Sequence, residues 1–207
     1  MWAQILKLKV WCDKTCQTFL LPVGIQDGIE IKFIYRGGGH NMDTIKLAGI
    51  VPESYTDGIG IRYTIFTQGC KHYCPDCHNP ETWDFDSGNI YKISDIIKDI
   101  KENPLLDGVT LSGGDPMYRV EETLNLIKAI RENTDLNIWL YTGFSWEECL
   151  ADEGKKEILE NIDVLVDGEY QKACRALHLR FRGSSNQRNI DVQKSLQSNK
   201  VVILIDD

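Results

Sequence analysis

Three cysteines close together constrain this chain more than any other feature of its sequence. Cys70, Cys74 and Cys77 are spaced C-x3-C-x2-C, so three thiolates fall within eight residues. Such a loop can wrap one compact polynuclear centre, and a closed four-iron cluster takes four cysteine ligands. With three cysteines, one iron keeps an open position, and open positions let metal sites transform small molecules. The spacing therefore predicts a reactive cluster held by these three thiolates.

The composition indicates cysteines that bind metal rather than form disulfides. The chain has seven cysteines, an odd number that does not suit a disulfide framework. We see neither an apolar run long enough to span a bilayer nor a signal-peptide pattern. We therefore expect a cytoplasmic protein, a compartment where clustered cysteines point to metal binding or catalysis. The net charge of −8 gives little support for a nucleic-acid or membrane partner.

The hydrophobic pattern from Met42 onward alternates strands with helices. Strands are predicted at residues 59–67, 108–111, 136–141, 162–166 and 201–205. Helices are predicted at residues 94–101, 120–131, 146–150 and 155–159. The first helix has Ser94 as its expected N-cap and Asn103-Pro104 as its stop. This alternation predicts an α/β fold with a parallel sheet, in which the loops after the strands meet on one face.

Two of those loops carry glycines next to polar residues. Residues 112–116 read Ser-Gly-Gly-Asp-Pro, and Tyr141-Thr142-Gly143 ends a later strand. Glycines let a backbone approach a ligand closely, and Asp115 is able to accept a hydrogen bond from an ammonium group. The alternative is a tight strand-to-helix turn with no further role. The cysteine motif favours the ligand-binding interpretation, because both loops are expected on one face.

The cysteine spacing resembles the signature of the radical S-adenosylmethionine (SAM) superfamily. The resemblance implies a [4Fe–4S] cluster on Cys70, Cys74 and Cys77 whose fourth iron binds SAM. It also implies that the reduced cluster breaks a carbon–sulfur bond of SAM and that a 5′-deoxyadenosyl radical abstracts a hydrogen. No protein side chain is then needed as the abstractor. The implied SAM contacts, three at the adenosyl end and three at the methionyl amine, are Asp76, Cys77, His78, Gly113, Gly114 and Asp115.

A wider set of motifs resembles one family, the anaerobic ribonucleoside-triphosphate reductase-activating proteins. The motifs include Pro80-Glu81-Thr82-Trp83, residues 164–168 and the Arg-Gly-Ser-Ser-Asn-Gln stretch at residues 182–187. The likeness covers about Met42 to Arg188. It implies a partial (β/α) barrel of radical SAM type that generates a glycyl radical on the anaerobic reductase. A low-potential electron donor such as flavodoxin or ferredoxin is the second implied partner.

Two other interpretations remain open at this point. The same chemistry can serve another substrate, as in activation of pyruvate formate-lyase or in deazaguanine formation, although residues 182–187 argue against it. A protein of a different class is a zinc-stabilised binding module with His72 or His78 as the fourth ligand. Metal analysis separates these, because zinc without iron or sulfide supports the binding module.

Residues 1–41 differ in texture from the rest of the chain. They end in Arg36, three glycines, His40 and Asn41, and they have no counterpart that we recognise in the family. One hypothesis is a mis-assigned start, with Met42 as the true first residue and residues 42–207 as the activase domain. The competing hypothesis is a real extension in which Cys12 and Cys16 bind metal or pair with each other. N-terminal sequencing of the native protein distinguishes the two.

Five further side chains have expected structural roles. Cys149 lies in a helical stretch and is expected to be buried or inert, and Cys174 is expected to be structural. Trp139 and Trp146, together with Trp83, are expected in the core or an interface rather than against a cofactor.

Overall fold

The computed structural model describes residues 43–205. Cys12, Cys16 and the proposed start at Met42 therefore lie outside the described residues. The division into residues 1–41 and 42–207 stays a prediction.

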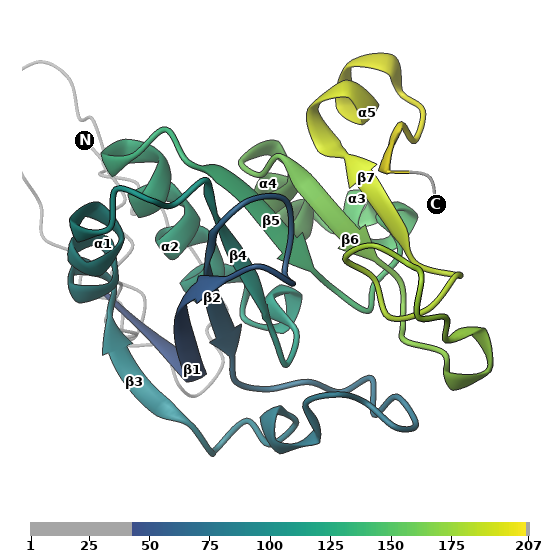
Figure 1. The fold of residues 1–207 in the computed structure, drawn as a ribbon, viewed down its shortest axis with the longest axis horizontal. Helices are drawn as coiled ribbons and strands as arrows, with labels where there is room; N and C mark the ends of the chain where they lie inside the picture. The colour runs from purple at the N-terminus through teal and green to yellow at the C-terminus, as the bar shows by residue number, and fades with distance from the viewer. Residues whose placement is uncertain (1–42, 206–207) are drawn as a thin grey trace, which may run out of the picture. The chain divides into compact units, whose positions relative to one another are not determined.

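One sheet of eight strands organises the described part of the chain (Figure 1). Its order is β3-β1-β2-β4-β5-β6-β7-β8. The strands are β1 (Thr44–Ser54), β2 (Arg62–Thr67), β3 (Asn89–Lys92), β4 (Gly108–Gly113), β5 (Asn137–Tyr141), β6 (Val164–Asp167), β7 (Arg188–Asp191) and β8 (Ile203–Ile205). β3 and β8 stand at opposite ends of this order, so the sheet is open in the manner of a partial barrel.

The four central strands form the parallel sheet that the sequence predicts. β2 pairs in parallel with β4, β4 with β5, and β5 with β6. The strands on both sides are antiparallel: β1 with β2 and β3, and β7 with β6 and β8. The α/β class is therefore confirmed, with antiparallel edges that the pattern did not predict.

Helices cover one face of this sheet. They are α1 (Ile93–Glu102), α2 (Val120–Asn133), α3 (Trp146–Ala151), α4 (Glu153–Glu160) and α5 (Val192–Ser198), with short 3-10 turns η1 (Pro80–Thr82), η2 (Pro116–Tyr118) and η3 (Lys172–Cys174). Because side chains alternate along a strand, Ile138 and Leu140 join the large helix-facing core, whereas Trp139 packs on the opposite face with Val164 and Val166.

The predicted N-cap of α1 is wrong. The helix begins at Ile93, its N-cap is Lys92 without a side-chain cap bond, and Ser94 lies inside the first turn. β3 ends at Lys92 and leads directly into the helix. The Ile93 amide donates a hydrogen bond to the Asp43 carbonyl at 2.8 Å. A tertiary contact with the residue before β1 therefore fixes where the helix starts, and a contact of this kind leaves no signal in the local sequence.

Three strands and one helix have no counterpart among the predicted elements. β1 contains Gly49 and Pro52, residues that weaken a strand signal. Pro52 lies beyond the part of β1 that pairs with β3, on an edge where no partner needs its missing amide. β3 and β7 have four residues each, and α5 has seven, which is too short for a clear period.

Within residues 43–205, no helix combines the length and the apolar character that crossing a bilayer requires.

Candidate functional site

Three loops meet at the carboxyl ends of the parallel strands. The cysteine loop follows β2, the Gly-Gly-Asp loop follows β4, and Thr142-Gly143 follows β5. The Gly114 amide donates to the Thr67 carbonyl at 2.9 Å, and the Asp115 amide donates to the Gly69 carbonyl at 3.0 Å. The predicted convergence of these loops is thereby confirmed, because the second loop is hydrogen-bonded to the residue that precedes Cys70.

The backbone of the cysteine loop is tightly curled. A residue with positive φ precedes each of the three cysteines: Gly69 (110°), Tyr73 (50°) and Asp76 (55°). Such residues turn the chain sharply, and non-glycine residues adopt them rarely outside functional or strongly supported segments. The Gly69 and Cys70 amides donate to carbonyls of η1 and Trp83, at 2.8 and 3.1 Å, so the curled loop is also fixed at its base.

The three thiols suit an iron–sulfur cluster by their chemistry. Cys70 is 6% exposed, and burial raises the pKa of its thiol to about 11; burial also raises the pKa of Cys74. Both side chains therefore favour the thiol form until a metal ion replaces the proton. The Asn79 amide donates to the Cys77 sulfur at 3.4 Å, the kind of bond that tunes cluster thiolates. Within residues 43–205, no three metal-ligating side chains converge on a single ion. A cluster needs no such convergence, because each cysteine binds a different iron.

The Asp115 carboxylate is buried at the centre of the three loops. It is 1% exposed, and its oxygens accept hydrogen bonds from the Met117 amide, the Thr142 hydroxyl and the Gly143 amide, at 2.9 to 3.0 Å. His72 Nε2 lies 2.8 Å from Asp115 Oδ2 as a further partner. The carboxylate thus joins all three loops through directed contacts.

His72 connects this centre to a fourth loop. Its Nδ1 lies 3.0 Å from Glu169 Oε1, so the ring is held between two carboxylates. Burial alone lowers the pKa of His72, but the hydrogen bond and charge of Asp115, followed by those of Glu169, outweigh burial and raise it. The ring also packs edge-on against Phe144 at 4.8 Å between centroids. His72 is therefore a packing and connecting residue.

The fourth loop follows β6 and packs on the cysteine loop. Tyr170 packs against His78 in a tilted arrangement with ring centroids 5.0 Å apart, and Lys172 pairs with Asp76 at 2.5 Å. Together with Glu169, these residues contact three positions of the cysteine loop. These three residues were not among the predicted site residues, although the strand at residues 162–166 and its closing Asp167-Gly168 marked where the loop begins.

The Arg-Gly-Ser-Ser-Asn-Gln stretch holds that fourth loop in place. Gln187 Oε1 accepts from the Gly183 and Ser184 amides at 2.9 and 3.2 Å, and its Nε2 donates to the Gly168 carbonyl at 2.9 Å. Asn186 donates to the Glu169 carbonyl at 2.8 Å. The motif therefore positions the residues that contact the cysteine loop.

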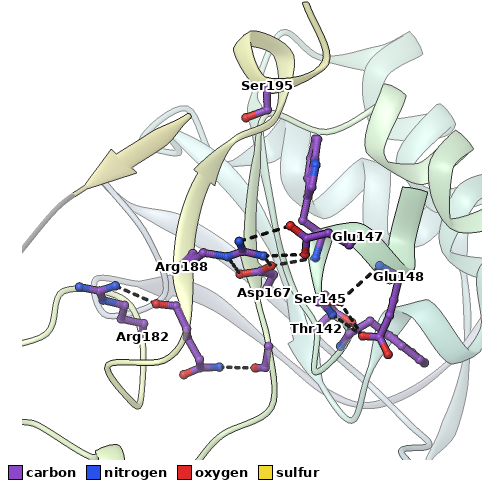
Figure 2. Close-up of polar contacts among 12 residues, drawn as sticks. Thr142, Ser145, Glu147, Glu148, Asp167, Arg182, Arg188 and Ser195 are labelled. Atoms are coloured by element: carbon purple, nitrogen blue, oxygen red, sulfur yellow. Dashed lines mark hydrogen bonds and ion pairs between the residues drawn. The ribbon is translucent and has the colours of Figure 1, made fainter. Parts of the chain in front are cut away.

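A charged network fixes the base of the same loop (Figure 2). Arg188 on β7 lies between Asp167 and Glu147, with its Nε 3.0 Å from Asp167 Oδ1 and an Nη 3.1 Å from Glu147 Oε2. Asp167 is 1% exposed and also accepts from the Trp146 amide at 2.8 Å. The network thus joins β6, β7 and the start of α3. The hydrogen bond from Arg188 lowers the pKa of Glu147.

The structure brings the remaining predicted SAM contacts to the same face. Asp76 and His78 are exposed on the cysteine loop, and Gly113 (φ 95°) pairs with Thr67 at the end of β4. A Cβ on Gly114 would lie 2.5 Å from the Gly69 carbonyl oxygen, so only glycine allows this approach.

The other singled-out side chains lie as follows. Cys149 is fully buried, as expected, and Trp139 and Trp146 are 2% and 5% exposed. Trp83 is half-buried and packs edge-on against Tyr73. Cys174 is half-buried in η3, with its sulfur 3.6 Å from Gln171 Oε1. Tyr141 donates from its hydroxyl to the Phe181 carbonyl at 2.8 Å.

Comparison with known proteins gives the family of the chain. Residues 56–190 match the family described as "4Fe-4S single cluster domain". The anaerobic ribonucleoside-triphosphate reductase-activating protein of Vibrio cholerae is 38% identical over 143 residues, covering 66% of this chain and 91% of that protein. The proteins of the same description from Escherichia coli K12 (36%; 66% and 92% covered) and Enterobacteria phage T4 (34%; 67% and 89% covered) are similar too.

Among solved structures, QueE from Escherichia coli matches with a TM-score of 0.40 and 18% identity, over 48% of this chain and 52% of that one. That likeness carries no weight in the assignment, which rests on the sequence relatives and the family match. The chain belongs to the anaerobic ribonucleoside-triphosphate reductase-activating proteins, which carry a single 4Fe–4S cluster domain.

Proposed function

We propose that this chain is a radical SAM enzyme that cleaves SAM reductively and generates a glycyl radical on anaerobic ribonucleoside-triphosphate reductase. The observation that carries the proposal is the cysteine loop, whose three thiols lie on a curled segment bonded to the Gly-Gly-Asp loop. Relatives named for activating that reductase are matched over about nine-tenths of their length.

Cys70, Cys74 and Cys77 would ligate the [4Fe–4S] cluster. When bound, the cluster and SAM supply the reductive cleavage of a carbon–sulfur bond and the hydrogen abstraction that follows it. The protein's own contribution is to hold these groups in a fixed geometry. The Asn79 amide stabilises the Cys77 sulfur, and the bonds at Gly69 and Cys70 fix the loop on the sheet.

The SAM contacts are proposed at the meeting point of the loops. Asp76, Cys77 and His78 would face the adenosyl end of SAM. Gly113 and Gly114, with Asp115, would face its methionyl amine. Because the Asp115 oxygens already bind four donors, its contribution is to orient the glycine backbone and the Thr142-Gly143 turn.

The reductase is the proposed protein substrate, and a flavodoxin or ferredoxin the proposed electron donor. An open sheet suits a protein substrate, because the unpaired edges leave one side of the barrel free for a presented glycine loop. The cytoplasm is the proposed compartment, since reduced cysteines and a low-potential donor are found there.

The test uses protein reconstituted with iron and sulfide without oxygen, then reduced and mixed with SAM. We expect 5′-deoxyadenosine and methionine from the parent, and neither from Cys74→Ala. Cys174→Ala is the matched control, because it removes a half-buried thiol outside the cysteine loop. Reductase is then added, and a glycyl radical is sought by electron paramagnetic resonance.

Each other outcome counts against part of the proposal. Zinc-loaded protein that never cleaves SAM would favour the binding module. SAM cleavage with a radical on pyruvate formate-lyase, and none on the reductase, would keep the chemistry and change the substrate.

A further inference from the structure

The loop between β6 and β7 has a charge unlike the rest of the chain. After Glu169 the loop contains no further Asp or Glu through residue 187, although the whole chain has a net charge of −8. The same residues contain four cationic side chains: Lys172, Arg175, Arg180 and Arg182. All four lie within residues 172–182, which we call the basic loop. A local positive field on an acidic protein is a device for selecting and steering a partner of opposite charge.

The basic loop also exposes an apolar side chain. Leu177 is 90% exposed, the largest exposed fraction among the large hydrophobic residues that the structure describes. Arg175, two residues before it, is exposed and forms no ion pair with any residue of the described region. An exposed leucine beside cations is typical of protein interfaces, where an apolar contact gives affinity and rim charges set the encounter rate.

The basic loop projects outward from the sheet, and its base is fixed by contacts to neighbouring segments (Figure 1). Arg175 forms an isolated bridge with Ser184, and the Ser185 amide donates to the Cys174 carbonyl at 2.8 Å. Lys172 pairs with Asp76 of the cysteine loop at 2.5 Å. The basic loop is therefore an anchored projection that begins next to the proposed cluster ligands.

We propose that the basic loop, through Arg175 and Leu177, docks an acidic and partly apolar segment of the protein substrate beside the cluster. This inference rests on the proposed function and extends it, because it names the surface that receives the substrate. Contact between Lys172 and Asp76 explains why docking there is useful: a segment bound to the basic loop lies next to the cysteine loop. The overall acidity of the chain favours a protein segment over a nucleic acid as the occupant.

The experiment compares two variants with a matched control. Arg175→Glu reverses a charge on the basic loop, and Leu177→Ser removes its exposed apolar side chain. Lys98→Glu makes the same charge reversal on α1, where the side chain is 73% exposed and far along the chain from the loop. Reconstituted protein is titrated with the anaerobic ribonucleoside-triphosphate reductase encoded by the same genome. Cleavage of SAM without the reductase is measured for every variant, to check that the cluster loop is intact.

We expect both loop variants to bind the reductase about tenfold more weakly, while Lys98→Glu binds as the parent does. Raising the ionic strength should weaken binding of the reductase to the parent. Binding to Arg175→Glu should change less, because that variant has already lost the attraction that salt screens. Glycyl radical formation at low reductase concentration should fall in step with binding, and SAM cleavage without the reductase should stay at the parent level.

Three results would overturn the inference, and they are distinguishable. If the parent binds and activates the reductase and both loop variants do so equally well, the docking surface lies elsewhere. If the variants lose binding to an RNA oligonucleotide but keep binding to the reductase, the loop serves a nucleic acid. If the parent cleaves SAM yet neither binds nor activates the reductase, the proposed function fails together with its docking surface.

Discussion

The two sides of the molecule are held together by different forces. On the helix-covered face, Leu126, Ile127 and Ile130 of α2 are 0% exposed and pack against the apolar side of the sheet. At the carboxyl ends of the strands, a few directed polar contacts around His72 and Asp115 join the loops. Apolar packing is non-directional and supplies most of the stability, whereas directed hydrogen bonds fix positions. The helix-covered face should therefore determine the free energy of unfolding. The contacts at the carboxyl ends of the strands should determine the geometry of the site.

The largest expected effect comes from the packed face. Leu126→Ala removes a fully buried side chain and should lower the free energy of unfolding by about 2–5 kcal/mol. The free energy is measured by urea denaturation of the cluster-free protein. At temperatures where the variant stays folded, its SAM affinity after reconstitution should match the parent's. A large change in that affinity would erase the contrast between the two sides.

Asp115→Asn addresses the centre of the loops. It removes the buried charge that His72 and three other donors contact, and should cost about 3 kcal/mol of stability. It should also weaken SAM binding, unlike Leu126→Ala. Asp135→Asn is the control, because that carboxylate is exposed at the surface. Equal results for the two asparagine variants would contradict the role assigned to Asp115.

Gly114→Ala sharpens the comparison through backbone contacts. The added Cβ would lie 2.5 Å from the Gly69 carbonyl oxygen, which forces the two loops apart, at a cost of about 1–3 kcal/mol. Reconstitution, followed by the visible absorbance of the cluster, should show reduced cluster content. At Gly49 on β1, nothing lies within 4 Å of the added Cβ, so Gly49→Ala should leave cluster content unchanged. Normal cluster content in both variants would show that the loops do not depend on close approach.

Glu169→Gln has the smallest expected effect. Glu169 is 55% exposed, so the loss of its ion pair with His72 should change stability by less than about 1 kcal/mol. SAM affinity, measured by equilibrium binding, should fall by less than about fivefold. Glu157→Gln removes a carboxylate of similar exposure, 48%, from its pair with Lys128 on the helix side and should leave SAM affinity unchanged. An effect of Glu169→Gln larger than that of Asp115→Asn would reverse the order of importance proposed for the two carboxylates.

Much of the central architecture was readable from the sequence. The apolar runs near residues 108–111 and 136–141 became β4 and β5, and the amphipathic pattern at residues 120–131 became α2, because buried strands and helix faces leave strong periodic signals. The antiparallel edges were not readable. β1 carries Gly49 and Pro52, and β3 and β7 are short, so pairing with neighbours rather than local pattern decides that they are strands.

The candidate site divides in the same way. The sequence by itself determined which residues are the candidates for cluster and SAM binding, because three closely spaced cysteines and a glycine loop are local features. Only the tertiary structure decided how they are held: His72 lies between Asp115 and Glu169, which are 43 and 97 residues away along the chain. Contacts across such separations depend on how the strands are ordered in the sheet. A linear pattern carries the identity of the candidate ligands, and the packed fold decides their geometry.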